Sequence, residues 1–594
     1  MSGMTSIYVG VSGLQASQTA LNTTSHNLAN VYTKGYTRQV SINGDRIYVN
    51  HGQTATNYKQ VGLGVNVIAT SRVRDILLDK AYRTENSRAQ FYDAQYDAVS
   101  EVENMLGEIN GQPFNQTLLN MENAIKEMAK TPNSETSQAE LVMYAEQFID
   151  RANAIYDEMV EYQNRLDDKI KDMVDTVNGI GDRIAELNEM IAGVESTSVE
   201  KANDYKDERD LLLDELSTYV SIKYTENENH YVNVNIEGVP FVTDNGVYKI
   251  QTKQLDGDKD SGFVTCVWPQ LDGQEVFNLS KGIDTTDPSN MGSLKGYIFA
   301  RGDFTADYTD VPNIKDYDLT TPEGKAKYEE DVKYYKENVS SCTLVKAEAL
   351  FDNLINGIVT ALNDVFCPNI KGMPEGVTSF TDANGNTYPD GELYNEDDIE
   401  YLDITTSTGA DNKLPPEELF TRDNTPRYIE VTGDDGNTYY ILNKKNNMGY
   451  ESLYRCGNVS INQAIIDDYS KLPFTTQGEG ERDEDFAKSA KLAETWGAIF
   501  SNLDPDNLTE LNFNSYYDQF IFDLSDDGNL YYNLTINQAD AANTLDEQRQ
   551  QITGVSSEEE LSNMIKFQQA YNASSRYITV VSEMLEHIIN RLGV

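Results

Sequence analysis

The sequence has little of the residue types that most catalytic and metal sites depend on. Its 594 residues include four Cys, four His and two Trp. The four cysteines lie far apart and form no CxxC pair, which argues against a zinc site and against a disulfide framework. The four histidines are equally scattered. We therefore expect no metal and no cofactor.

Positive charge is also scarce. The chain has 47 Lys and Arg against 97 Asp and Glu, a formal net charge of −50. So little basic surface argues against binding to nucleic acid and to anionic membranes. No run of 18 apolar residues is present, and the start of the chain has neither a basic segment nor a compact apolar block. We expect no membrane span and no cleaved signal peptide.

Charge is missing altogether from the first 33 residues, although 24% of the chain is charged. At that average, about eight charges would be expected there. Within this stretch, Ile7, Leu14, Leu21 and Leu28 recur every seven residues, so they form one line on a helix. The residues three and four positions after each are mostly small or polar. This pattern predicts a helix that a second helix can approach closely.

The other end of the chain shows an a/d heptad pattern, which is typical of coiled coils. Met564, Tyr571, Ile578, Leu585 and Leu592 are seven residues apart, and Phe567, Ser574, Val581 and Ile588 follow three residues after the first four. Ser556 and Glu559 match a capping box at the start of this helix. Each terminal helix is thus the obvious partner of the other.

Between the two ends, apolar periodicity predicts helices over 81–110, 141–191, 205–220 and 345–366. Gly179 and Gly181 are expected to bend or break the longest of them. Strand-like alternation begins near Val232, and the turn sequences at 382–388 and 434–440 predict two hairpins. Helical character returns near Asp485.

These patterns predict a mainly α fold with a β-rich insert, in an α+β arrangement. The chain goes out and comes back, with paired coiled-coil termini, a long helical rod and an outward β-rich domain. The expected boundaries are 1–55 and 552–594 for the terminal domain, 56–367 and 476–551 for the rod, and 368–475 for the insert.

No sequence motif indicates an enzyme. DGDKDSG at 256–262 is faintly similar to a calcium loop, but Ser261 and Val267 stand where Gly and Glu are needed. The chain has no P-loop, HExxH or nucleophile-elbow motif. A solvated turn is the simpler interpretation of 256–262.

Four segments carry a resemblance to a known family. GLQASQTALNTTSHNLANVYTKGYTRQ (13–39) resembles the N-terminal signature of bacterial flagellar axial proteins, with Asn27, Ala29, Asn30, Gly35 and Tyr36 matching and Lys34 replacing the usual Pro. FQQAYNASSRYI (567–578), ERDLLLDELSTYVSI (208–222) and IEGVPFVTDNG (236–246) are similar to the family of hook-associated protein 1 (FlgK). The resemblance does not cover the middle insert.

The resemblance implies a structural subunit of the flagellum, exported unfolded, that forms the junction layer between hook and filament. It implies a homo-oligomer in a tubular layer whose neighbours are the hook protein and another hook-associated protein on the filament side. An export chaperone would bind the C-terminal helix before secretion. The predicted assembly interface is the list Ile7, Leu14, Leu21, Leu28, Met564, Phe567, Tyr571, Ile578, Val581, Leu585, Ile588 and Leu592, and the signature turn holds Asn27, Asn30, Gly35 and Tyr36.

Two alternatives stay open at this point: another axial protein, such as the hook or distal rod protein, and an extracellular adhesin whose insert meets a host surface. A physical argument bears on assembly in either axial case. The conformational entropy lost in ordering the last 34 residues exceeds what the burial of eight apolar side chains returns. We therefore expect the C-terminal helix to become fully ordered only when neighbouring subunits add contacts.

Overall fold

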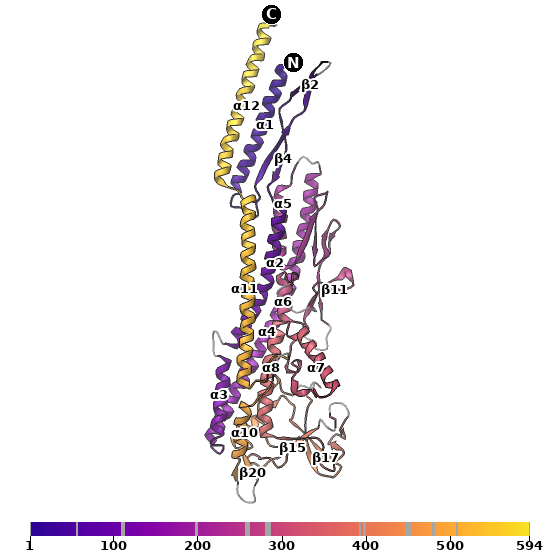
Figure 1. The fold of residues 1–594 in the computed structure, drawn as a ribbon, viewed down its shortest axis with the longest axis vertical. Coiled ribbons are helices and arrows are strands. Elements are labelled where there is room, and N and C mark those ends of the chain that lie inside the picture. Colours follow the sequence, from indigo (N-terminus) through magenta and orange to yellow (C-terminus); the bar gives the residue numbers. More distant parts are fainter. Residues whose placement is uncertain are drawn as a thin grey trace.

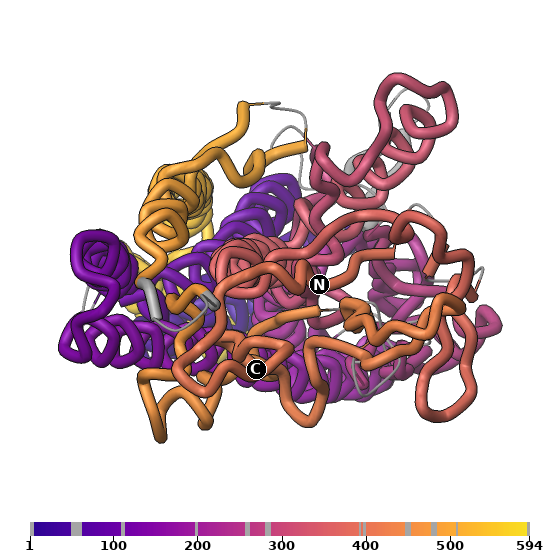
Figure 2. The backbone as a smooth tube through the Cα atoms, turned by 90° about the horizontal axis from the view of Figure 1, so that it is seen from below, coloured from indigo at the N-terminus to yellow at the C-terminus, as the bar shows by residue number. Residues whose placement is uncertain are grey.

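The structure is a computed structural model that describes residues 2–54, 57–107, 113–196, 200–255, 262–279, 287–390, 394–395, 399–445, 453–477, 482–505 and 509–592. The molecule is long and narrow, and both chain ends lie at the same end of it (Figure 1). Residues 368–475 lie at the opposite end, nearest the viewer in Figure 2. The mainly α fold with a β-rich insert is confirmed, and the chain runs out and back as expected.

The terminal layer is built from two helices and a small sheet. Helix α1 (Ser2–Ala29) packs antiparallel to α12 (Ser557–Leu592) and also contacts β1 (Gln39–Asp45) and β4 (Val65–Arg72). Strands β1 and β4 pair antiparallel, and β2 (Tyr48–Thr54) pairs with β3 (Asn57–Gly62). These strands were not expected from the sequence, although Val40 and Ile42 alternate with polar residues.

The rod is a bundle of long helices. Helix α2 (Ile76–Leu106) lies along α11 (Phe513–Thr553) and also contacts α4 (Glu135–Glu195), whose 61 residues span about 90 Å. The shorter helices of the rod are α3 (Phe114–Met128), α5 (Asn203–Tyr219), α6 (Ser293–Arg301), α7 (Pro322–Tyr334) and α8 (Thr343–Phe366). The four helices predicted by periodicity are confirmed, with ends shifted by a few residues.

The expected break of the longest helix at its two glycines is wrong, because α4 continues through both. Gly181 instead makes room for a neighbour: a Cβ there would lie 2.5 Å from Cζ of Phe241. Phe241 belongs to β7 of a four-stranded sheet, β5 (Ile222–Glu226), β6 (Val232–Ile236), β7 (Val239–Thr243) and β8 (Gly246–Val247), which covers this part of α4. A second sheet follows it, with β9 (Gln251–Gln254), β10 (Val264–Trp268) and β11 (Gln274–Glu275).

This difference between the two glycines makes a prediction about stability. Gly181→Ala should destabilise the rod by about 1–3 kcal/mol, because Phe241 must move. Gly179→Ala, where a Cβ meets nothing within 4 Å, should stabilise it by about 0.5–1 kcal/mol through helix propensity. Urea unfolding of both variants checks the pair, and equal effects would contradict it.

The insert contains a six-stranded sheet of order β12–β15–β18–β17–β13–β14. Its strands are β12 (Asn369–Lys371), β13 (Phe380–Asp382), β14 (Thr387–Tyr388), β15 (Glu400–Leu402), β17 (Tyr428–Gly433) and β18 (Thr438–Leu442). Both predicted hairpins are confirmed, as β13–β14 and β17–β18. The possible calcium loop at 256–262 lies almost entirely outside the described residues.

Two smaller sheets complete the insert and its return to the rod, β16 (Phe420–Arg422) with β19 (Val459–Ile461), and β20 (Thr475–Gln477) with β21 (Arg482–Glu484). Helix α9 (Gln463–Asp467) follows β19 in the chain, and α10 (Phe486–Gly497) follows β21. Phe420 and Tyr454 belong to the hydrophobic core of the rod, whereas Phe380 and Ile441 form a separate cluster. The domain boundaries given above remain a prediction.

Candidate assembly site

The contact between α1 and α12 uses the heptad positions of α12. Met564, Phe567, Tyr571, Ile578 and Leu585 are half-buried, and Val581 is buried. Among the described side chains of α12, only Val581 and Glu560 are buried. One chain therefore covers the heptad line only in part.

On α1, the predicted line Ile7, Leu14, Leu21 and Leu28 is half-buried, and smaller residues make the closest approach. A Cβ at Gly10 would lie 2.7 Å from Cγ1 of Ile578, and one at Gly13 would lie 3.0 Å from Oγ of Ser574. The small residues of the uncharged segment thus bring the two helix backbones close together.

Ile588 lies apart from this contact. Ile588 is half exposed, because the antiparallel register set by Gly10 and Ile578 carries α12 past the start of α1. Leu592 is the last residue of α12, and its side chain is outside the described part of the structure. The other ten predicted residues lie on the two helices, half-buried or, for Val581, buried, and their role as an assembly interface stays a prediction.

Asn27 is the central residue of the signature turn, and its side chain is 1% exposed. Its Nδ2 donates to the Gln39 carbonyl at 2.9 Å and to Oε2 of Glu560 at 3.2 Å. Its Oδ1 accepts from the Gln39 N–H at 3.0 Å and from the Tyr36 hydroxyl at 2.7 Å. Every hydrogen-bonding position of the amide is occupied. Asn27 therefore joins the end of α1, the start of β1 and the start of α12.

The other signature residues shape the turn itself. Asn30 Nδ2 donates to the His26 carbonyl at 3.0 Å, and Asn30 Oδ1 accepts from the Thr33 hydroxyl at 3.1 Å. Gly35 has a φ of +81°, a left-handed conformation that glycine adopts without strain. Burial, and then the nearby carboxylates, raise the pKa of Tyr36, so its hydroxyl keeps the proton that it donates to Asn27.

Arg38 connects this turn to the start of α12. Its Nε lies 3.0 Å from Oε1 of Glu560, and its Nη2 lies 2.8 Å from Oε1 of Glu559. The Ser556 hydroxyl accepts from the Glu559 N–H at 3.4 Å, so one half of the predicted capping box forms. The Glu559 carboxylate pairs with Arg38.

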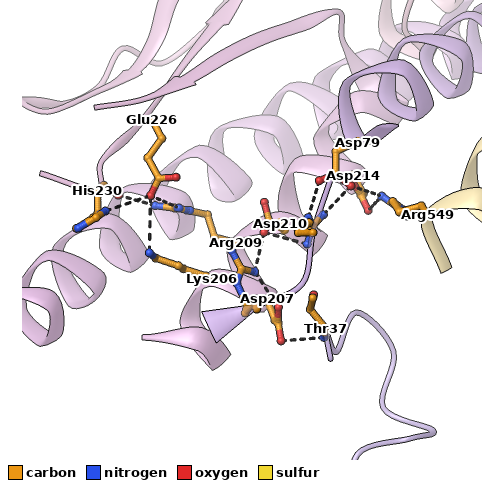
Figure 3. A network of polar contacts seen from close by, with 12 residues as sticks. Thr37, Asp79, Lys206, Asp207, Arg209, Asp210, Asp214, Glu226, His230 and Arg549 are labelled. Atoms are coloured by element: carbon orange, nitrogen blue, oxygen red, sulfur yellow. Dashed lines mark hydrogen bonds and ion pairs between the residues drawn. The ribbon is translucent and has the colours of Figure 1, made fainter. Parts of the chain in front are cut away.

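Next to the turn lies a network of four arginines and five aspartates, shown in part in Figure 3: Arg72, Arg74, Arg83, Arg549, Asp79, Asp207, Asp210, Asp214 and Asp546. Arg72 Nη1 lies 2.7 Å from Oδ1 of Asp207, and Asp207 Oδ2 accepts from the Thr37 N–H at 3.0 Å. Arg549 Nη1 lies 2.7 Å from Oδ2 of Asp214. We call residues 27–39, 72–83, 204–214 and 546–560 the collar. It links the terminal layer to α2, α5 and α11.

The collar surrounds an open groove of about 1060 Å³, lined by the 30–38 turn, by α2 and α5, and by the junction of α11 and α12. Its walls carry both signs of charge, as in Arg74, Arg549, Asp214 and Glu559. The mixed charge and open shape fit a packing surface better than a small-molecule pocket.

Sequence reasoning named the signature turn but missed the ionic part of the collar. Asp207, Asp210 and Asp214 follow one another at spacings of three and four, so they share one face of α5. That spacing was visible in the helix predicted at 205–220. What the sequence could not indicate is the set of arginines, which come from segments more than 100 residues away in either direction.

Loss of the Asn27 amide should weaken the assembled protein. Asn27→Ala removes the amide that bonds to the backbone of Gln39 and to Oε2 of Glu560, while Arg38 still pairs with Oε1 of Glu560, and we expect a cost of about 1–3 kcal/mol per chain. Thermal dissociation of the assembled protein measures this loss. Asn22→Ala, an exposed change on the same helix, is the matched control. Equal dissociation temperatures for the two variants would count against the role given to Asn27.

Asp210 predicts a dependence of stability on pH. Burial alone would raise the pKa of Asp210, but Arg74, Arg72 and Arg83 outweigh it and hold that pKa below its ordinary value. A lowered carboxyl pKa contributes stability above the unfolded pKa of about 4, and the contribution disappears as the pH falls through the folded pKa.

Asp210→Asn should therefore cost about 2–4 kcal/mol at pH 7, and the difference from the unchanged protein should shrink below pH 4. Urea unfolding at pH 7, 5 and 3 checks this trend. Asp150→Asn, an exposed change on α4, should differ little from the unchanged protein at any of these pH values. A difference for Asp210→Asn that grows toward low pH would contradict the assignment.

Comparison with known proteins gives a consistent result. A family model for the "flagellar hook-associated protein FlgK helical domain" matches residues 99–365. Models for the "flagellar basal body rod FlgEFG protein C-terminal" and the "flagella basal body rod protein" match residues 547–592 and 7–37. The last two cover α12 and α1.

The curated relatives share one name. The chain is 26% identical to flagellar hook-associated protein 1 of Bacillus subtilis over 100% of this chain and 99% of that protein. It is 21% identical to flagellar hook-associated protein 1 of Salmonella typhimurium over 98% of each chain. The solved structure of the flagellar hook junction protein FlgK from Burkholderia pseudomallei has the same fold, with a TM-score of 0.50 and 11% identity over 80% of this chain and 100% of that one.

Two further findings concern the described residues alone. None of their helices combines the length and the apolar character that a membrane crossing requires. Their His, Cys, Asp and Glu side chains form no group of three or more that is suited to hold a metal ion.

Proposed function

This chain belongs to the family of flagellar hook-associated protein 1, and we propose that it forms the layer that joins the hook to the filament through contacts of its terminal helices. Membership makes it a structural protein of the flagellar axis, which assembles with other flagellar proteins. The assembly interface is the heptad line of α12 and the facing line of α1. The collar sets the orientation of this pair on the rod.

The observation that carries the proposal is the incomplete burial of the terminal helices. In α12 a four-repeat heptad pattern runs through a helix in which only two described side chains are buried. A helix of this kind gains most of its stability from packing against other elements. Copies of the same chain in a tubular layer would supply that packing.

The partners follow from this position. We infer that the hook protein lies on one side of the layer and another hook-associated protein on the filament side. Before export, a chaperone would cover the apolar positions of α12. The β-rich insert lies far from both termini, so it would point outward from the tube (Figure 1).

Gold labelling of this chain on native flagella tests the proposal. A tag placed in the exposed turn at 434–437 of the insert leaves both termini free. We expect label as one narrow band between hook and filament. Label along the filament, along the hook or over the cell surface would contradict the proposal, and the last result would favour an adhesin.

A further inference from the structure

Exposed apolar side chains gather in the terminal layer. Among the described residues, more than half of the exposed large hydrophobic side chains lie in 2–77 and 552–592, which are about a fifth of the chain. Large exposed apolar patches on soluble proteins usually mark interaction surfaces. In the terminal layer they form two separate surfaces.

The first surface is a second apolar line on α12, apart from the heptad line that faces α1. We call it the outer stripe: Ile565, Ala573, Tyr577, Val580 and Met584. Its members follow one another at spacings of three, four or eight residues, so they lie along one side of the helix. All of them are exposed in the single chain.

The second surface is the exposed face of the small sheet, which we call the strand face: Val40, Ile42, Ile47, Tyr48 and Ile68. The sheet turns its other side to α1, where the Ser12 hydroxyl accepts from the Val65 N–H at 3.1 Å. Ile68 packs over Gly44 of the paired strand, since a Cβ there would lie 2.6 Å from Cδ1 of Ile68. Val40, Ile42 and Ile68 thus lie on the exposed face of the β1–β4 pair, and Ile47 and Tyr48 follow β1 in the chain.

We propose that the strand face of one copy packs on the outer stripe of the next copy around the layer. This inference rests on the proposed function, because it takes the copies to be related by rotation about a tube axis. Under such a rotation a surface cannot meet its own equivalent, so each contact joins two different surfaces of the chain. The terminal layer offers two such surfaces.

Size and charge support a second copy as the partner. Each surface presents five exposed apolar side chains, which suits the apolar centre of an interface that buries roughly 800 Å² on each side. From Leu561 to Met584 the only charged residues are Lys566, Arg576 and Glu583. The whole chain carries −50, so copies repel one another except where charge is sparse.

Cysteine cross-linking on native flagella tests the contact. The variants are Ile68→Cys on the strand face, and Ile565→Cys and Val580→Cys on the outer stripe, each in a chain with Cys342→Ser because the other three cysteines are buried. Two differently tagged variants are produced together in cells that lack the unchanged protein, and their flagella are oxidised. The matched control is Gln18→Cys on the exposed polar side of α1.

We expect covalent dimers when Ile68→Cys is combined with Ile565→Cys or Val580→Cys, and none from any variant alone or from combinations with Gln18→Cys. Ile565 and Val580 are about 22 Å apart along α12, so the pair that reacts reports the axial offset between copies. Dimers from Ile68→Cys alone or from a stripe variant alone would overturn the inference. So would the absence of dimers from both combinations.

Gold labelling of the same flagella separates the two hypotheses. Label at the junction without cross-links between the two surfaces would support the proposed function and contradict this contact. Absence of label from the flagellum would remove the proposed function, on which the contact depends.

Discussion

Cells whose only copy of this protein lacks residues 561–594 will build hooks without filaments and lose filament subunits to the medium. The truncation removes almost all of α12 and with it both the heptad line and the outer stripe. Without α12, α1 loses its helical partner and the layer loses the contacts between copies. Electron micrographs and an assay of filament subunits in the medium measure the outcome.

A control is needed because truncation could also block export. The truncated chain should be sought in the medium, and its rod should unfold in urea like that of the full chain, since the core of α2, α4 and α11 lies outside the deleted segment. Normal filaments on cells with the truncated chain would rule out the main assignment.

The second large effect is expected from Gly10→Leu combined with Gly13→Leu. Side chains at these positions would collide with Ile578 and Ser574 and push α1 away from α12. Overpacking of this kind costs about 1–3 kcal/mol per site, and the cost recurs in every copy of the layer. We expect at least a tenfold loss of filaments per cell, with the rod unchanged.

Gln18→Leu is the matched control, because Gln18 is an exposed position of α1. It adds the same side chain to the same helix without entering the contact with α12. Filament counts and swimming speed of the two strains give the comparison. Equal motility would show that close approach at Gly10 and Gly13 is not required.

The sequence was informative where local periodicity decides the structure. The seven-residue spacing in α12 predicted which side chains would be least exposed, and Val581 is the most buried apolar residue of that line. The expected break at Gly179 and Gly181 failed because a contact with a residue far away in the sequence decides the structure there. Helix propensity argues against glycine, but the packing of Phe241 on Gly181 needs a residue without a side chain.

The sequence was least informative where partners are far apart in the chain. Asn27 and Glu560 are separated by 533 residues, and no spacing rule predicts that they meet. The strands between Gln39 and Arg72 were missed because their alternation is interrupted by a bulge between Ile42 and Asn43 and by polar residues on both faces. The outer stripe was missed because only the stronger heptad line was sought.

The central claim is that the terminal helices become fully ordered only when copies assemble. The collar anchors the start of α12, but beyond Glu560 only Val581 is buried among the described side chains of that helix. Ordering such a helix costs more conformational entropy than one chain's contacts return. The rod has a continuous apolar core, so its helices have the buried contacts that the terminal helices lack within one chain.

Hydrogen exchange of backbone amides tests this claim most directly, in purified monomer and in isolated flagella. The account predicts fast exchange over residues 1–35 and 561–594 in the monomer, slow exchange there in the flagellum, and slow exchange in the rod in both. Strong protection of both terminal segments in the monomer, at the level of the rod, would contradict it.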